Sequence, residues 1–398
     1  MRSGDWLTAD RVRAAGTVSL ALTCLSILYL LLTSHGTLDA WGRPLGTDFS
    51  DVWTAGQMAL DGRAPAAWDW AAHYQVQQVA HGDPHVPFYG WHYPPPFLLL
   101  AALLAFLPYV AALFVWQAAS LWGAVRVCRA ILPGRTALLA IFGAPVVLVC
   151  ATHGQNGFLT AALLGGGLLL LDRKPLLAGL LFGCLIYKPQ FALVIPLLLL
   201  AGGHVRAIAG ACLSAAVLVG ATLAIWGWPV WQAFLDSLPL TRQVVIEQGE
   251  TGWHKIQSLF AMVRMWGGSV PLAYAVQGTA TLAAMGAVFW LARTGRPQVR
   301  AAAVCAAALL STPYVLDYDL VLLGLGAAFL AADGLARGFL PWEKSLLALV
   351  WIAPLAARPL AEVSLFPLGQ ASIFMLLALA LRRGLAAGLP AKAAPAAS

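Results

Sequence analysis

Polar residues that could do chemistry are gathered in a few short groups, although most of the chain is apolar. The first group contains Asp48 and Asp51, whose spacing places both on one face if the segment is helical. A carboxylate at a boundary between water and lipid can accept the proton of a sugar hydroxyl, or bind a cation. Two simpler interpretations stay open: Asp48 is the N-cap of a helix that begins near Phe49, and Asp51 is a solvated helix residue.

Two further groups combine aromatic, histidine and amide side chains. In a run that ends in three prolines, His92 and Tyr93 could line a pocket for an acceptor or a phosphate. Trp91 in the same run fits an aromatic anchor at a membrane surface. In a polar hairpin between two apolar segments, His153 or Gln155 could face a cavity, and capping of the helix ends is the alternative.

Basic residues elsewhere in the chain could bind an anion. Lys188, followed by Gln190, lies between two apolar runs, which is a costly place unless its ammonium reaches water or a phosphate. The three cations His254, Lys255 and Arg264 would be explained together by an anionic ligand. A helix end that carries surface charges would account for each of the three separately.

A last group lies at the start of an apolar segment late in the chain. Tyr314 and Asp317 fit the binding of a sugar, or of a cation on a partner, whereas Asp319 fits a structural cap. The sequence has no Walker A loop, no HExxH, no GxSxG in a suitable setting and no GxGxxG after a strand. The six cysteines show no ligand spacing. We therefore expect no cofactor, no metal and no nucleic-acid partner, and neither coupling to ATP nor use of a nucleotide sugar inside the cell.

The composition is that of a membrane protein with many spans. Of 398 residues, 60% are hydrophobic and 10% are charged, whereas a soluble domain carries about 25% charged residues. The length of the first apolar run favours a retained anchor over a cleaved signal peptide. About twelve spans are expected, at residues 14–34, 109–131, 136–151, 156–171, 175–187, 190–202, 205–226, 270–292, 300–312, 316–332, 343–357 and 365–381.

The charge distribution predicts the orientation of these spans. With the N-terminal residues 1–13 in the cytoplasm, 17 of the 24 Lys and Arg residues fall on the inner face, as the positive-inside rule requires. Twelve of the 17 acids and seven of the eight histidines fall on the outer face. The seven outer cations are Arg43, Arg63, Lys188, Arg242, Lys255, Arg264 and Arg358.

Two long outer loops follow from this layout, at residues 35–108 and 227–268. The apolar segment 94–108 is short for a span, and counting it as one would move five inner cations to the outer face. We therefore predict an interfacial helix there, in the first periplasmic loop. The whole chain, 1–398, is expected to form one integral membrane domain, with a disordered cytoplasmic tail at 384–398.

Several of these segments together resemble a known group of enzymes. They are Asp48-Phe49 through Gly56, Tyr93-Pro94-Pro95, Gly154-Gln155-Asn156, Lys188-Pro189-Gln190, Gln257-Ser258-Leu259 and Ser311 to Asp319. Their order and their common side of the membrane resemble the multi-span glycosyltransferases of the GT-C type, and more narrowly glycosyltransferase family 87. That family includes mannosyltransferases that depend on polyprenol-phosphate mannose.

The resemblance implies transfer of a hexose, with mannose favoured, from a polyprenyl-phosphate-linked donor to a lipid or glycan acceptor. It implies a GT-C-like helical bundle in a bacterial cytoplasmic membrane, with the site facing the periplasm. Asp48 is then the general base of an inverting transfer. Lys188, His254, Lys255 and Arg264 are then candidates to stabilise the leaving lipid phosphate.

Two other function classes compete with this hypothesis. A transporter or flippase of lipid-linked sugars should show internal repeats and ionisable residues in mid-span, and neither is evident here. A scaffold subunit of an envelope-assembly complex would need no base at Asp48.

Overall fold

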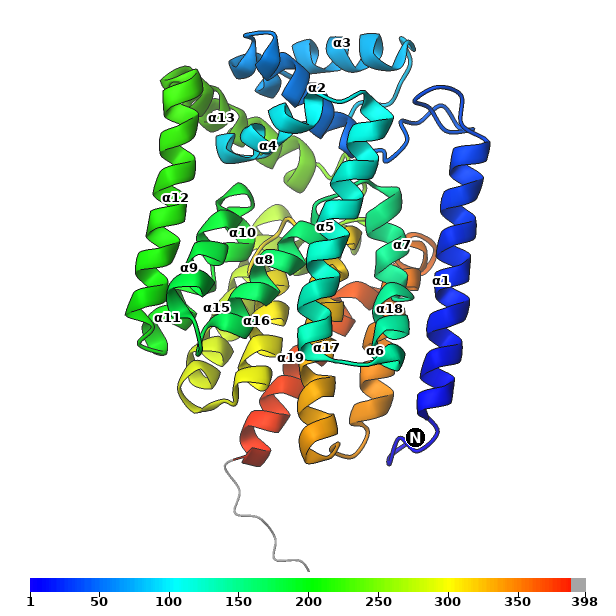
Figure 1. Ribbon diagram of the computed structural model, residues 1–398, viewed down its shortest axis with the longest axis vertical. Coiled ribbons are helices and arrows are strands. Elements are labelled where there is room, and N and C mark those ends of the chain that lie inside the picture. The colour runs from blue at the N-terminus through cyan, green and yellow to red at the C-terminus, as the bar shows by residue number, and fades with distance from the viewer. Residues whose placement is uncertain (388–398) are drawn as a thin grey trace, which may run out of the picture.

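The computed structural model describes residues 1–387, and every regular element among them is helical (Figure 1). Seven helices are long and apolar enough to cross a membrane. They are α1 (Ala9–Leu32), α5 (Tyr109–Ile131), α12 (Val205–Trp226), α15 (Val270–Thr294), α17 (Val321–Arg337) with the 3-10 turn η4 (Asp317–Leu320) before it, α18 (Glu343–Ser364) and α19 (Leu368–Ala387). The chain is thus an all-helical, multi-pass membrane protein, as the composition predicted.

Shorter helices fill the space between these spans. They are α6 (Arg135–Phe142), α7 (Pro145–Thr152), α8 (Gly157–Leu170), α9 (Pro175–Gly183) with η2 (Cys184–Tyr187), α10 (Pro189–Ala192), α11 (Ile195–Ala201) and α16 (Pro297–Leu310). Proline occupies the first helical position of four of them, where its missing N–H costs no hydrogen bond. The pair α6 and α7, bent by 45°, is an eighth span if it is counted as one helix. The expected total of about twelve spans is not confirmed, because it requires the shorter helices to be spans as well.

A layer of helices lies across one end of the bundle (Figure 1). It contains α2 (Phe49–Leu60), η1 (Ala64–Trp68), α3 (Trp70–His81), α4 (Pro95–Ala105) and α13 (Trp228–Thr241), which continues as the π-helix η3 (Arg242–Glu247). We call these elements the end layer. A further short helix, α14 (Leu259–Met265), packs against α15. The end layer is built from the two long loops that the charge bias placed on one side.

The segment 94–108, expected to form an interfacial helix, contains the helix α4. It packs against α2, α12 and α13, and Leu98 and Ala101 are fully buried in these contacts. Leu103 and Phe106 stay exposed on the other side. The helix is therefore tied to the end layer, and its position at a membrane surface stays a prediction.

Ion pairs gather at the opposite end, where the N-terminus also lies (Figure 1). Asp333 pairs with Arg296 through two hydrogen bonds of 2.9 and 2.6 Å, and it also pairs with Arg383. Arg383 pairs in turn with Glu343. Asp333, Glu343 and Arg383 lie on α17, α18 and α19, and Arg296 is the N-cap residue of α16, so the cluster ties these four helices together.

The C-terminal helix extends farther than the sequence suggested. The disordered tail was expected from residue 384, but α19 continues to Ala387. Residues 388–398, the rest of that expected tail, lie outside the described residues.

Candidate active site

A cavity of about 960 Å³ lies between the end layer and the ends of the short helices beneath it. We call it the polar cavity. Irregular backbone is tolerated inside a membrane protein where it lines such a space, and here the breaks after α7 and before η4 do so. Ten of the candidate site residues line it: Asp48, Asp51, His92, Tyr93, His153, Gln155, Gln190, Lys255, Tyr314 and Asp317.

Asp48 stands at the N-cap position of α2, but its carboxylate makes no capping hydrogen bond. Its Oδ2 accepts a hydrogen bond of 3.0 Å from Nε2 of Gln155 instead. Gly154 makes this approach possible, since its φ is +63° and a Cβ there would lie 2.7 Å from the carbonyl oxygen of Gly46. The capping interpretation of Asp48 is therefore wrong.

A continuous chain of hydrogen bonds leads from Gln155 into the core. The Tyr93 hydroxyl donates to Oε1 of Gln155 at 3.0 Å and accepts from Nδ2 of Asn156 at 2.8 Å. Oδ1 of Asn156 accepts from Nζ of Lys188 at 3.0 Å. Lys188 also donates to Asp319 at 2.6 Å. Five side chains from four segments thus hold one another in a fixed arrangement behind Asp48.

Lys188 is placed differently from either interpretation of the sequence. Its side chain does not snorkel to water, because the residue is only 2% exposed and the ammonium pairs with the equally buried Asp319. It does not line the polar cavity either. Its charge is compensated inside the protein, so the geometry favours a positioning role over contact with a phosphate.

Asp51 shares the cavity with Asp48 and is 5% exposed, so the solvated-residue interpretation is wrong. Its Oδ1 has no hydrogen-bond partner among the described residues. Burial, followed by the charge of Asp48, raises the pKa of the Asp51 carboxyl well above its ordinary value. Burial also raises the pKa of Asp48, while His153 and the Gln155 hydrogen bond oppose that shift. The Gln155 hydrogen bond favours the ionised form of Asp48, and no hydrogen bond does the same for Oδ1 of Asp51 within the described residues.

His92 forms part of the cavity wall below α13. Its Nδ1 lies 3.1 Å from Oγ1 of Thr241, and its ring meets that of Tyr314 edge-on. Burial lowers the pKa of His92 to about 4, so the ring is neutral at neutral pH and supplies no cation for an anionic ligand. The neighbouring Trp91 is 1% exposed and stacks on Phe97, so its assignment as a surface anchor is wrong.

Two of the predicted cations, His254 and Arg264, do not line the cavity. Arg264 donates to the carbonyl oxygens of Gly268 and Glu247, and its guanidinium lies 4.8 Å from the ring centre of Trp253. These contacts tie together the segment before α15, so the geometry gives Arg264 a structural role.

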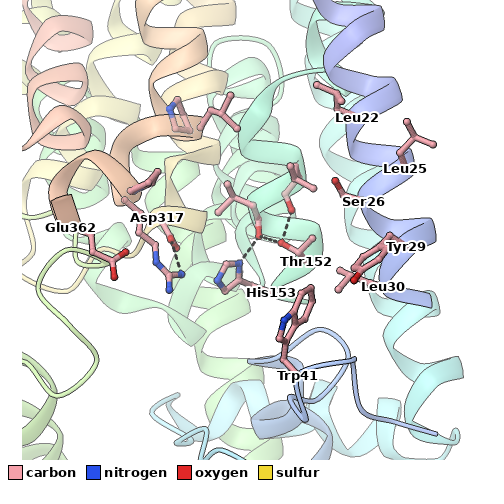
Figure 2. A pocket seen from close by; sticks show the side chains of 16 residues that line it. Leu22, Leu25, Ser26, Tyr29, Leu30, Trp41, Thr152, His153, Asp317 and Glu362 are labelled. Atoms are coloured by element: carbon pink, nitrogen blue, oxygen red, sulfur yellow. Dashed lines mark hydrogen bonds and ion pairs between the residues drawn. The ribbon is translucent and has the colours of Figure 1, made fainter. Parts of the chain in front are cut away.

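A second, mostly apolar cavity of about 650 Å³ opens between α1, α7 and α18 (Figure 2). We call it the lateral groove. Its α1 wall consists of Leu22, Leu25, Ser26, Tyr29 and Leu30. Three residues border both this groove and the polar cavity: His153, Asp317 and Arg358. The groove and the polar cavity therefore meet at these three side chains.

Three cations of the polar cavity were not selected from the sequence, namely Arg43, Arg242 and Arg358. A signal for them existed, because all three belong to the seven cations that the charge bias left on the outer face. Within residues 1–387, no group of three or more His, Cys, Asp or Glu side chains is placed to hold a metal ion.

The comparison with known families decides the class of the protein. The model of glycosyltransferase family 87 matches residues 91–316, which is more than half of the chain. The chain belongs to glycosyltransferase family 87. No curated protein and no solved structure was found to match it.

For this family 87 glycosyltransferase, the matched segment supplies much of the cavity wall, including Tyr93, Gln155, Lys255 and Tyr314. The transporter alternative is not favoured by this result. Asp48 and Arg358 lie outside the matched segment, on either side of it, yet they line the same cavity.

Proposed function

We propose that this family 87 enzyme transfers a hexose, specifically mannose, from a polyprenyl phosphate to a lipid or glycan acceptor. The enzyme is of the GT-C type in this proposal, and the transfer takes place at the outer face of a bacterial cytoplasmic membrane. A lipid-linked donor has an apolar chain and a polar head. The observation that most supports a donor of this kind is that the apolar lateral groove joins the polar cavity at His153, Asp317 and Arg358.

Asp48 is the general base in this proposal. Its Oδ2 is held by Gln155, and its Oδ1 forms no hydrogen bond within the described residues, so one oxygen is free to meet an acceptor hydroxyl. The base takes the proton as the acceptor oxygen forms a bond to the anomeric carbon. The bond from that carbon to the phosphate oxygen breaks on the opposite side, and its electrons leave with the polyprenyl phosphate. Attack opposite the leaving group inverts the anomeric configuration.

The charge that develops on the phosphate requires cations nearby. Lys255 lines the polar cavity and is half-buried, which strengthens its interaction with an anion. Asp51, with its raised pKa, is suited to donate a hydrogen bond to a sugar oxygen while Asp48 is ionised. Tyr93 and Tyr314 add hydroxyl groups to the same wall.

A transfer assay tests the donor class. Purified enzyme in lipid nanodiscs is incubated with polyprenyl-phosphate [14C]mannose or with GDP-[14C]mannose, together with a lipid extract as acceptor. We expect labelled product from the polyprenyl donor alone, and digestion with linkage-specific mannosidases should show an inverted anomer. Transfer from GDP-mannose would contradict the proposal, and equal use of polyprenyl-phosphate glucose would contradict the choice of mannose.

A topology assay tests the membrane side independently of activity. Alkaline phosphatase, which folds only outside the cytoplasm, is fused after Gly62 in the end layer or after Gly338 at the opposite end. We expect phosphatase activity from the Gly62 fusion alone. Activity from the Gly338 fusion alone would place the polar cavity in the cytoplasm.

A further inference from the structure

Arg358 occupies the junction between the two cavities. It lies on α18, its side chain is 35% exposed, and it borders the lateral groove as well as the polar cavity. Nη1 of Arg358 lies 3.6 Å from Oδ2 of Asp317 (Figure 2). This separation is too long for a good hydrogen bond, so the pair is held by charge alone.

A second cation, Lys255, lines the same polar cavity as this arginine. Lys255 comes from the loop before α14, and its pKa is lowered first by burial and next by the charge of Arg358. Burial lowers the pKa of His254; the charge of Glu362 opposes this shift, and the charges of Arg358 and Lys255 add to it. Cations that repel one another across a cavity wall are stabilised by an anion bound between them.

The lining of the lateral groove indicates which chemical group is attached to the bound anion. Its walls are the leucine side chains of α1 and the proline-containing stretch of α18, including Pro354 and Pro359. Asp317 and Glu362 lie at one end of the groove, away from the leucine residues of α1 (Figure 2), and Arg358 pairs with Asp317. A long apolar chain that ends in a phosphate matches this distribution.

Asp317 has one oxygen committed and one that depends on Arg358. Its Oδ1 accepts the backbone N–H of Tyr318 at 2.9 Å. Its Oδ2 faces Arg358, and the residue lines the polar cavity at 4% exposure. If the guanidinium moved away, Oδ2 would need another donor, since a buried carboxylate oxygen without one is unfavourable.

We propose that Arg358 exchanges partners when the donor binds: it leaves Asp317 for the lipid phosphate, and Asp317 accepts a hydrogen bond from a hydroxyl of the donor sugar instead. The exchange rests on the proposed lipid-phosphate donor. In this exchange, binding of the phosphate draws Arg358 away and so leaves Oδ2 of Asp317 available to accept a hydrogen bond from the sugar. Arg358 lies outside the segment matched by the family model, so the assignment depends on this chain's own geometry.

Lipid binding tests the phosphate contact without any need for turnover. Detergent-solubilised enzyme is titrated with undecaprenyl phosphate or with the uncharged undecaprenol, and the bound fraction is measured by native mass spectrometry. Arg358→Gln should weaken binding of the phosphate about tenfold and leave undecaprenol unchanged within about twofold. Arg63→Gln is the matched control, because Arg63 is an outer-face cation that lines neither cavity and pairs with the exposed Asp61. Its effect should stay within about twofold.

A double-variant cycle tests the exchange itself. Asp317→Asn removes the competitor for Arg358 and should tighten phosphate binding about tenfold. In the Arg358→Gln background the same change should have less than about a twofold effect, because no guanidinium remains to be released. An equal gain in both backgrounds would show a general charge effect and overturn the exchange. Arg358→Lys retains a cation, and we expect it to restore part of the binding if Arg358→Gln is unstable.

Turnover separates failure of the exchange from failure of the proposed function. Asp317→Asn should bind the lipid phosphate more tightly yet transfer sugar at least about tenfold more slowly, because its side chain no longer offers a carboxylate to the sugar. If the wild type binds undecaprenyl phosphate with the expected cycle but transfers no sugar, the move of Arg358 from Asp317 to the phosphate stands and the proposed function is wrong. If the phosphate and undecaprenol respond alike to Arg358→Gln, the exchange is wrong.

Discussion

Nε2 of Gln155 donates a hydrogen bond of 3.0 Å to Oδ2 of Asp48, which lies 107 positions earlier in the chain. An N–H directed at a carboxylate stabilises its ionised form, which is the form a general base needs. The rest of the network, from Tyr93 to Lys188 and Asp319, holds Gln155 in this orientation.

Gln155→Leu removes the N–H that Asp48 accepts and keeps a side chain of similar size. We expect kcat to fall about tenfold or more, and the pKa of Asp48 to rise, which should move the acidic limb of the pH–rate profile upward by about one unit. Steady-state kinetics between pH 5 and 9 measure both effects. Gln190→Leu is the control, since Gln190 lines the cavity without a hydrogen bond to Asp48. An unshifted limb in Gln155→Leu would show that the bond does not influence the base.

The wild-type enzyme should lose activity as the pH falls. Burial raises the pKa of Asp48 above its ordinary value of 3.8, and only the ionised carboxylate can take a proton. The rate should therefore rise with pH through the raised pKa and then level off. The profile of kcat/KM in Asp48→Asn should lack this limb. A wild-type rate that is highest at the acidic end of the range would rule out an aspartate base.

Lys188→Met leaves Asp319 buried and without its partner. Breaking a buried ion pair from one side costs about 3–5 kcal/mol, so the thermal midpoint of the variant should fall clearly below that of the wild type. The neutral pair in Lys188→Met/Asp319→Asn should recover most of this loss. Thermal unfolding followed by intrinsic tryptophan fluorescence gives the midpoints of the wild type, the single variant and the double variant. We expect the single variant to have the lowest midpoint.

The same variants separate two roles of Lys188. If it positions Gln155 through Asn156 and Tyr93, the double variant should lower kcat and leave KM for the donor within about twofold. A large rise in KM with an unchanged kcat would instead support contact between Lys188 and the donor phosphate.

Asp51 should make the stability of the fold depend on pH. Its pKa in the folded protein is raised well above 3.8, so the folded state binds a proton more tightly than the unfolded chain does. The stabilisation is complete below the ordinary pKa and is lost as the pH rises toward the raised value, by at most about 1.4 kcal/mol per pH unit. Asp51→Asn should flatten this dependence of the unfolding midpoint. An identical pH dependence in both proteins would contradict the assignment.

Much of the helical layout was predictable because long apolar runs and charge bias are local signals. The segments 109–131 and 205–226 were expected as spans and appear as α5 and α12 with the same bounds. The end layer combines the two loops that the positive-inside rule placed together. The broken helices α7 to α11 were harder, because length and hydropathy do not distinguish a short span from a buried helix that ends at a cavity.

The sequence predicted which residues belong to the candidate site better than it predicted which of them contact one another. Acids and histidines far from the basic face pointed to Asp48, His153 and Asp317, and all three line the polar cavity. The partner of Lys188 could not be derived, because Asp319 is 131 residues away and nothing local indicates that the two meet. Arg358 was missed for the same reason, since its role depends on two cavities that meet only in the folded chain.

The central claim is that Asp48 acts as the base of a transfer from a lipid-linked donor, and one comparison tests it most directly. Purified wild type and Asp48→Asn are assayed with polyprenyl-phosphate mannose in nanodiscs, and binding of undecaprenyl phosphate and the unfolding midpoint are measured on the same samples. We predict that the variant keeps its fold and its lipid binding while transfer falls by about a hundredfold or more. Transfer by folded Asp48→Asn at the wild-type rate would contradict the account.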